Sequence, residues 1–95
     1  MQKYKIAHIK EQNTQLIVAP LDKSFDNKTP AQQHAFVNVL QTCATSAGLA
    51  GTVVPIWLSN NKVKFIAPKN WHPFFSSPGI YQRILANINK ELSCS

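Results

Sequence analysis

The chain has 95 residues, of which 44% are hydrophobic, and its ten lysines and arginines against four acids give a formal charge of +6. The length predicts one domain, residues 1–95, and the hydrophobic content excludes a disordered chain. Residues 1–10 alternate charged with apolar side chains, so we expect neither a secretory signal nor a membrane span there. No partner in a membrane is therefore expected.

The two cysteines are too few for a disulfide framework and lack the spacing of a metal site. Cys43 falls on the apolar side of a predicted helix, where a reduced thiol in the core is expected. Cys94 lies next to the last residue and is expected to be exposed. Reduced thiols are typical of a reducing compartment, so the sequence predicts a cytoplasmic protein.

Two strands are predicted at the start of the chain, over residues 4–12 and 14–20, with a turn between them. In the first strand, Tyr4, Ile6 and His8 share one side by simple alternation. The second strand carries a continuous apolar run, residues 16–19, which is typical of an interior strand. The polar residues that follow, up to Lys28, end this pattern.

A helix is predicted between Pro30 and Gly48. Thr29 is a capping residue followed by proline at the first helical position, and Gln32 stands where the partner of a capping box is found. Gly48 is a typical helix stop. The apolar residues at three- and four-residue steps predict the buried stripe of this helix: Phe36, Val39, Leu40, Cys43 and Ala47.

A β-hairpin is predicted over residues 51–68, with Asn60 and Asn61 as its two-residue turn. Pro55 lacks the N–H that a ladder requires, which predicts an edge strand or a bulge. After the aromatic segment NWHPFFSSPG, residues 70–79, Ser77 and Pro78 repeat the cap-then-proline signal. A second amphipathic helix is predicted from there, with these apolar residues: Ile80, Ile84, Leu85, Ile88 and Leu92.

The resulting order, ββαββα, predicts an α+β fold. We expect a two-layer sandwich, in which a mainly antiparallel four-stranded sheet carries both helices on one face.

The most unusual feature is the absence of Asp, Glu, Lys and Arg from Thr29 through Asn61. Charge depletion is a property of interface cores, whereas exposed helices normally carry charges. The alternative interpretation is that amides and hydroxyls hydrate this face adequately. The first interpretation predicts a small non-enzymatic association module, a homodimer or an accessory subunit, with these partner-binding residues: Gln33, Gln41, Trp57, Trp71, Phe74 and Phe75.

Catalytic, metal and cofactor sites are not expected. The histidines, His8, His34 and His72, lie on separate predicted elements, and no zinc-type pairing or nucleophile elbow is present. We therefore predict no catalytic residue, no metal ligand and no cofactor.

Two further binding interpretations remain open. A phosphate or carboxylate is a possible ligand of the second helix start, through Lys69, His72, Ser76 and Ser77, unless Ser77 only caps the helix and His72 only bonds a loop carbonyl. A weakly sequence-specific nucleic-acid-binding protein is the alternative function. It would use a sheet face bearing Lys3, Lys5, Lys62 and Lys64, if the two hairpins adjoin. Lysines on a solvated sheet face also simply oppose aggregation.

Overall fold

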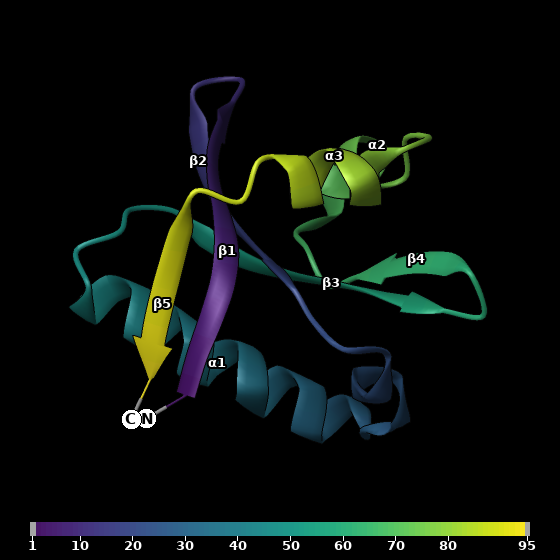
Figure 1. The fold of residues 1–95 in the computed structure, drawn as a ribbon, viewed down its shortest axis with the longest axis horizontal. Helices are drawn as coiled ribbons and strands as arrows, with labels where there is room; N and C mark the ends of the chain where they lie inside the picture. Colours follow the sequence, from purple (N-terminus) through teal and green to yellow (C-terminus); the bar gives the residue numbers. More distant parts are fainter. Residues whose placement is uncertain (1, 95) are drawn as a thin grey trace.

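The computed structural model describes residues 2–94, and its centre is a mixed five-stranded sheet in the order β4-β3-β2-β1-β5 (Figure 1). The strands are β1 (Gln2–Glu11), β2 (Thr14–Pro20), β3 (Thr52–Ser59), β4 (Lys62–Phe65) and β5 (Lys90–Cys94). The α-helices are α1 (Pro30–Ser46), α2 (His72–Phe75) and α3 (Ile80–Ala86), with 3₁₀ turns at Lys23–Asn27 and Lys69–Trp71. The α+β class is confirmed.

Both predicted hairpins are present, and their turns explain why. Gln12 and Asn13 connect β1 to β2 with φ values of 49° and 63°, and Asn60 and Asn61 connect β3 to β4 with values of 52° and 65°. Two successive residues at positive φ form the turn whose twist matches that of antiparallel strands. Asparagine adopts this conformation more readily than most residues, so the turn sequences fix both hairpins.

The two hairpins meet through a parallel pair, which the predicted antiparallel sheet did not include. Strand β2 pairs with β3 in parallel, with Ile17 opposite Val53 and Ala19 opposite Pro55. The connection between them contains α1, and a helical crossover of this length returns the chain in the same direction. The predicted four-stranded sheet is therefore corrected to a mixed sheet of five strands, in which three of the four strand pairs are antiparallel.

Helix α1 begins and ends as expected. The Thr29 hydroxyl accepts from Gln32 N at 3.1 Å while the Gln32 amide accepts from Thr29 N at 3.0 Å, which completes the capping box. Gly48 follows the helix with φ of 77°. The buried face is rotated from the predicted stripe: Leu40 and Ala44 are buried, whereas Val39 is 51% exposed.

The second predicted helix is much shorter than expected. Helix α3 ends at Ala86, and residues 90–94 form β5, which pairs antiparallel with β1. The Asn89 side chain accepts from His8 N at 2.9 Å and donates to His8 O at 3.0 Å, so it takes the place of a strand neighbour. Leu92 and Cys94 are buried while their neighbours are exposed, which is the alternation of a strand. The ββαββα order is therefore wrong in its last element.

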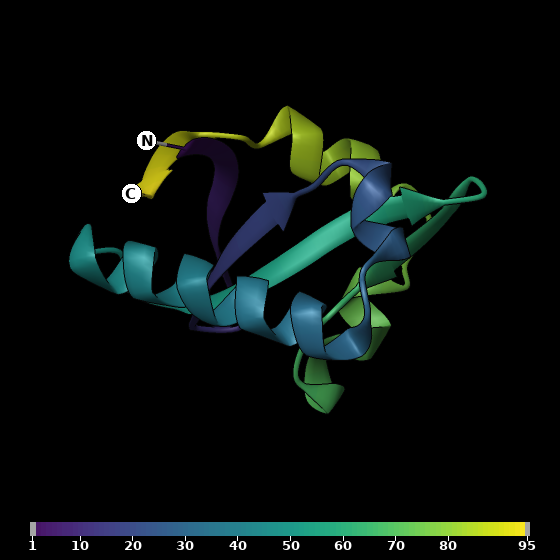
Figure 2. The ribbon, with the colours of Figure 1, turned by 90° about the horizontal axis from the view of Figure 1, so that it is seen from below.

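The helices divide between the two faces of the sheet, and not onto one face as expected. Leu40 and Ala44 of α1 pack with Ile17 and Val53 on one face. The other face carries a second cluster, in which strand residues pack against α2 and α3: Ala7, Leu16, Val18, Val54, Ile56, Trp71, Phe75, Ile80 and Ile84. In Figure 2, β2 and β3 lie between α1 and α3.

Pro55 lies in an interior strand, contrary to the edge prediction. Its carbonyl accepts from Ile66 N at 3.2 Å, on the side of β3 that faces β4. The missing N–H of Pro55 points to this same side, because the two groups of one residue in a strand share a direction. The return bond from Pro55 N to Ile66 O cannot form, and β4 ends at Phe65, one residue before this position.

A disulfide joins Cys43 of α1 to Cys94 of β5, with the Cα atoms 5.6 Å apart. The expectation of reduced thiols is therefore corrected. The sequence pattern did not indicate this pair, because the helical spacing up to Leu92 places Cys94 beyond a helix and not in a strand beside α1. The bond fixes the last turns of α1 next to the end of β5.

No helix within the described residues is both long and apolar enough to cross a membrane.

The disulfide is expected to stabilise the fold by restricting the unfolded chain. Its cysteines are separated by 51 residues, for which loop-closure entropy predicts an upper bound of about 4 kcal/mol. The variant Cys43→Ala/Cys94→Ala should lower the free energy of unfolding by about 2–4 kcal/mol. Urea unfolding with and without reductant measures this. The double variant is the control, because reductant should not change it, and an unchanged wild type in reductant would contradict the assignment.

Candidate association surface

The predicted aromatic anchors lie mostly in the core. Trp57 and Trp71 are 3% and 6% exposed, and Phe75 is fully buried. Phe74 is half-buried, with the Arg83 guanidinium 5.5 Å from its ring centre. Trp57 lies on β3 and packs against Phe25, with the ring centres 4.8 Å apart. The other rings are buried because residues 69–75 form two short helical turns that pack on the sheet, and His72 is helical (φ −57°, ψ −42°) despite the following proline. These rings therefore give little surface for a partner.

The two predicted partner-binding glutamines make hydrogen bonds that hold α1 to the rest of the fold. Gln41 Nε2 donates to Gly51 O at 3.1 Å, and its Oε1 accepts from Val53 N at 2.9 Å. Gln33 Nε2 donates to Phe25 O at 3.1 Å. Charged side chains would not make this paired donor and acceptor contact. Part of the uncharged stretch is thus explained by internal hydrogen bonds.

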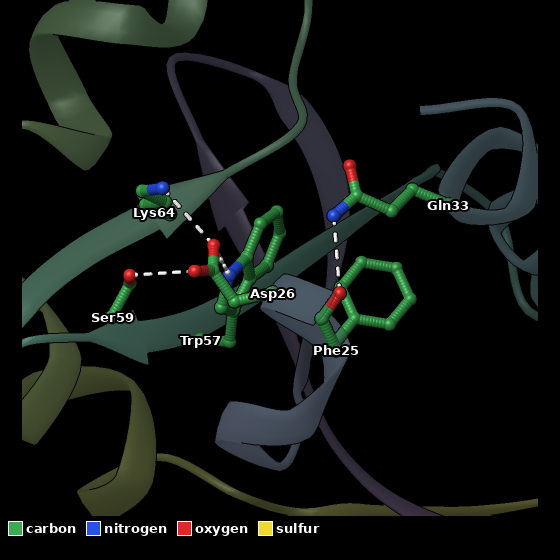
Figure 3. A network of polar contacts seen from close by, with 6 residues as sticks. All are labelled: Phe25, Asp26, Gln33, Trp57, Ser59 and Lys64. Atoms are coloured by element: carbon green, nitrogen blue, oxygen red, sulfur yellow. Dashed lines mark hydrogen bonds and ion pairs between the residues drawn. The ribbon is translucent and has the colours of Figure 1, made fainter. Parts of the chain in front are cut away.

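Asp26 joins the segment before α1 to the β3–β4 hairpin (Figure 3). Its carboxylate accepts from Ser59 Oγ at 2.8 Å, from Lys64 Nζ at 3.0 Å and from Trp57 Nε1 at 3.2 Å. The bonds from Ser59, Lys64 and Trp57 lower the pKa of Asp26 to about 2, because each favours the ionised carboxylate. All three donors serve the fold, so this network offers no free group to a substrate.

The four residues of the predicted anion site have local roles. His72 Nε2 lies 3.1 Å from Ala67 O, and the Ser77 hydroxyl donates to Phe74 O. Ser76 donates its backbone N–H to His72 O, and Lys69 is exposed. Helix α3 has only seven residues and follows Gly79, without a side-chain cap. A helix this short does not form an anion site at its start on its own.

The four lysines of the predicted nucleic-acid surface are not brought together. Lys3 and Lys5 lie on β1, and Lys62 and Lys64 on β4, with β2 and β3 between them. This order separates the pairs by about 14 Å across the sheet. Lys3 lies 3.7 Å from Glu91, and Lys64 pairs with Asp26, so two of the four have carboxylate partners.

The exposed side of α1 retains the uncharged character that the sequence indicated. The exposed residues of this face include Ala31, Gln32, Ala35, Asn38, Val39, Thr42, Thr45 and Ser46. A hollow of about 540 Å³ lies between this helix and β5. Its lining residues are Asn38, Val39, Thr42, Cys43, Ser46, Ala47 and Ser93.

Strand β5 forms one edge of the sheet, and no other strand within residues 2–94 pairs with its outer side. Figure 1 shows the last turns of α1 extending beyond this edge. The hollow therefore lies where a further strand would be placed, with α1 as its floor. We call the hollow and the free edge of β5 together the α1–β5 groove.

None of the six predicted partner-binding residues lines this groove. The sequence indicated the uncharged helix α1 in general, placed Val39, Cys43 and Ala47 on its buried stripe, and missed β5. The available signal was the alternation in KELSC, residues 90–94, which competes with the helical spacing of Ile84, Ile88 and Leu92.

Comparisons of the chain with protein-family models, with curated proteins and with solved structures found no match.

Asp26 should make stability depend on acid pH. A carboxyl whose pKa falls from 3.8 to about 2 on folding stabilises the fold fully above pH 3.8, and this contribution is lost as the pH falls through about 2. Asp26→Asn should therefore lower the melting temperature at pH 7 by several degrees. It should also remove part of the decrease in melting temperature that the wild type shows between pH 4 and 2. Thermal unfolding across that range measures both. Asp22→Asn is the control, because this carboxylate bonds only locally to Ser24 N; an equal effect of both substitutions would contradict the assignment.

Proposed function

We propose that the protein is a non-enzymatic association module that binds an extended segment of a protein partner in the α1–β5 groove. The observation that carries this proposal is the juxtaposition of an unpaired strand edge with an uncharged hollow. In this arrangement the partner's backbone bonds to β5 and one or two of its side chains enter the hollow. Addition of a strand to a sheet edge is a common mode of peptide recognition.

The composition of the groove supports a protein partner. Its lining residues carry no charge in a chain of net charge +6, and depletion of charge is the compositional mark of interface cores. Val39 is the large exposed apolar residue of the groove, at 51% exposure. Its side chain is suited to contact an apolar residue of the added strand.

The other edge of the sheet is less suited to association. Strand β4 has four residues, and two of them are Lys62 and Lys64. Lysines on an edge strand oppose the addition of a further strand. Of the two edges, β5 therefore has the better support.

The nucleic-acid alternative has less support than the groove. Its lysines lie on two separated strands, and helices cover both faces of the central strands.

The proposed compartment also changes, because the Cys43–Cys94 disulfide favours an oxidising environment over a reducing cytoplasm.

A charge placed in the groove should abolish binding without affecting the fold. A phage-displayed library of random peptides, selected on the wild-type protein, supplies the probes. We expect peptides that bind the wild type at least tenfold more tightly than Val39→Lys, because the lysine would be desolvated by the added strand. Calorimetric titration of the selected peptides measures the two affinities.

Leu85→Lys is the matched control for this substitution. Leu85 is 46% exposed on α3 and makes no part of the groove, so its replacement changes charge and exposed apolar surface in the same way. Selected peptides should bind this variant like the wild type. A library that yields no binder, or binders that tolerate Val39→Lys, would overturn the proposed function.

A further inference from the structure

We infer that the segment bound in the groove is β5 of a second copy of this chain. The two strands would pair antiparallel about a two-fold axis through Leu92, and the two sheets would become one continuous sheet. This inference rests on the proposed function and names its partner.

The sequence of β5 is complementary to itself in this register. Antiparallel pairing about Leu92 places Glu91 opposite Ser93 of the second copy and Lys90 opposite Cys94 of the second copy, so no like charges face each other. Pairing about Lys90 would place Lys90 opposite Lys90 of the second copy, and pairing about Glu91 would place Glu91 opposite Glu91 of the second copy. A shift by one residue would put the two α1 helices on opposite faces of the joined sheet.

The charges next to this strand pair also fit a second copy. Lys3 lies opposite Ser93 in the β1–β5 ladder and 3.7 Å from Glu91. In the paired sheet, Glu91 of one copy lies next to Ser93 of the other, and Lys3 of that other copy follows on the next strand. Each Glu91 therefore lies between the lysines of two β1 strands, which is favourable for a carboxylate.

The same test applied to β4 gives the opposite result. Antiparallel pairing of β4 with itself about Val63 would place Lys62 of one copy opposite Lys64 of the other. Two chains of charge +6 repel each other over most of their surface, and like charges directly opposite destabilise a strand pair. Of the two sheet edges, β5 is the one whose charges allow two copies to approach.

The position of α1 leaves room for both helices on one face. The disulfide holds Cys43 at Cys94, two residues from the proposed axis, so the two disulfides would stand roughly 14 Å apart along the strands. Helices pack at about 8–10 Å between axes, so the two α1 helices pass beside each other without overlap. Their uncharged sides at the groove, including Val39, would then lie on the same face of the joined sheet.

Two substitutions at Ser93 test the register with opposite signs. Ser93→Lys would place a lysine opposite Glu91 of the second copy and should strengthen dimerisation, whereas Ser93→Glu should weaken it on the order of tenfold. Within one chain the preference is reversed, because residue 93 lies opposite Lys3. Monomer stability at high dilution should therefore favour Ser93→Glu over Ser93→Lys, so a general effect on folding cannot produce the expected ranking.

Sedimentation equilibrium over a wide concentration range measures the dimer constants, and denaturant unfolding at the lowest concentrations measures the monomers. Gln82→Glu and Gln82→Lys are the charge-matched controls, because Gln82 is exposed on α3. They should leave the dimer constant unchanged. A dimer ranked Ser93→Lys, wild type, Ser93→Glu supports the inference.

Two results would overturn it. One is a chain that stays monomeric at all concentrations, and the other is a dimer whose constant is the same for both Ser93 variants. Either result leaves the peptide selection to decide the proposed function, because peptides that depend on Val39 would then identify a different protein as the occupant. The peptide selection is made at concentrations at which the chain is monomeric, so that a second copy does not compete for the groove and each proposal fails on its own measurement.

Discussion

The parallel pairing of β2 with β3 is the constraint on which the rest of the structure depends. It requires a crossover, and α1 supplies it, held to the start of β3 by Gln41. Once these two strands occupy the centre, each hairpin extends the sheet outward, and β4 becomes one edge. The opposite edge is formed by β5. The chain reaches it only after α2 and α3 have crossed the second face of the sheet. The position of the groove at β5 follows from this order.

The uncharged stretch from Thr29 to Asn61 has two physical causes in the structure. Toward the sheet, amide side chains are needed because Gln41 must donate and accept at once, and Gln33 must reach a backbone carbonyl. Away from the sheet, the same absence of charge leaves α1 with an uncharged outer face beside a free strand edge. Internal hydrogen bonding accounts for the amides that face the sheet, and the proposed association would account for the uncharged outer face.

Local signals in the sequence predicted the elements whose structure depends on a few adjacent residues. The two hairpin turns and the capping box of α1 belong to this group, because positive φ at paired turn residues and a Thr-x-x-Gln cap are local requirements. Strand β5 does not, since KELSC is a strand only because the outer side of β1 is available to pair with it. The disulfide and the division of helices between two faces depend on that same pairing. For the candidate site, the sequence indicated only that α1 is uncharged, and the tertiary fold was needed to identify both the residues of α1 that line the groove and the edge of β5.

The antiparallel pairing of β1 with β5 brings Gln2 opposite Cys94, so the two ends of the described chain lie side by side (Figure 1). This arrangement determines how the protein responds to mechanical force. Tension applied at these ends would open the β1–β5 ladder like a zipper, with its hydrogen bonds loaded one after another and not all together. The extension would stop at the sulfur bridge, because every residue between Cys43 and Cys94 lies inside a covalent ring that carries no load. The strand that is easiest to detach would be β1, and β5 would remain attached to α1.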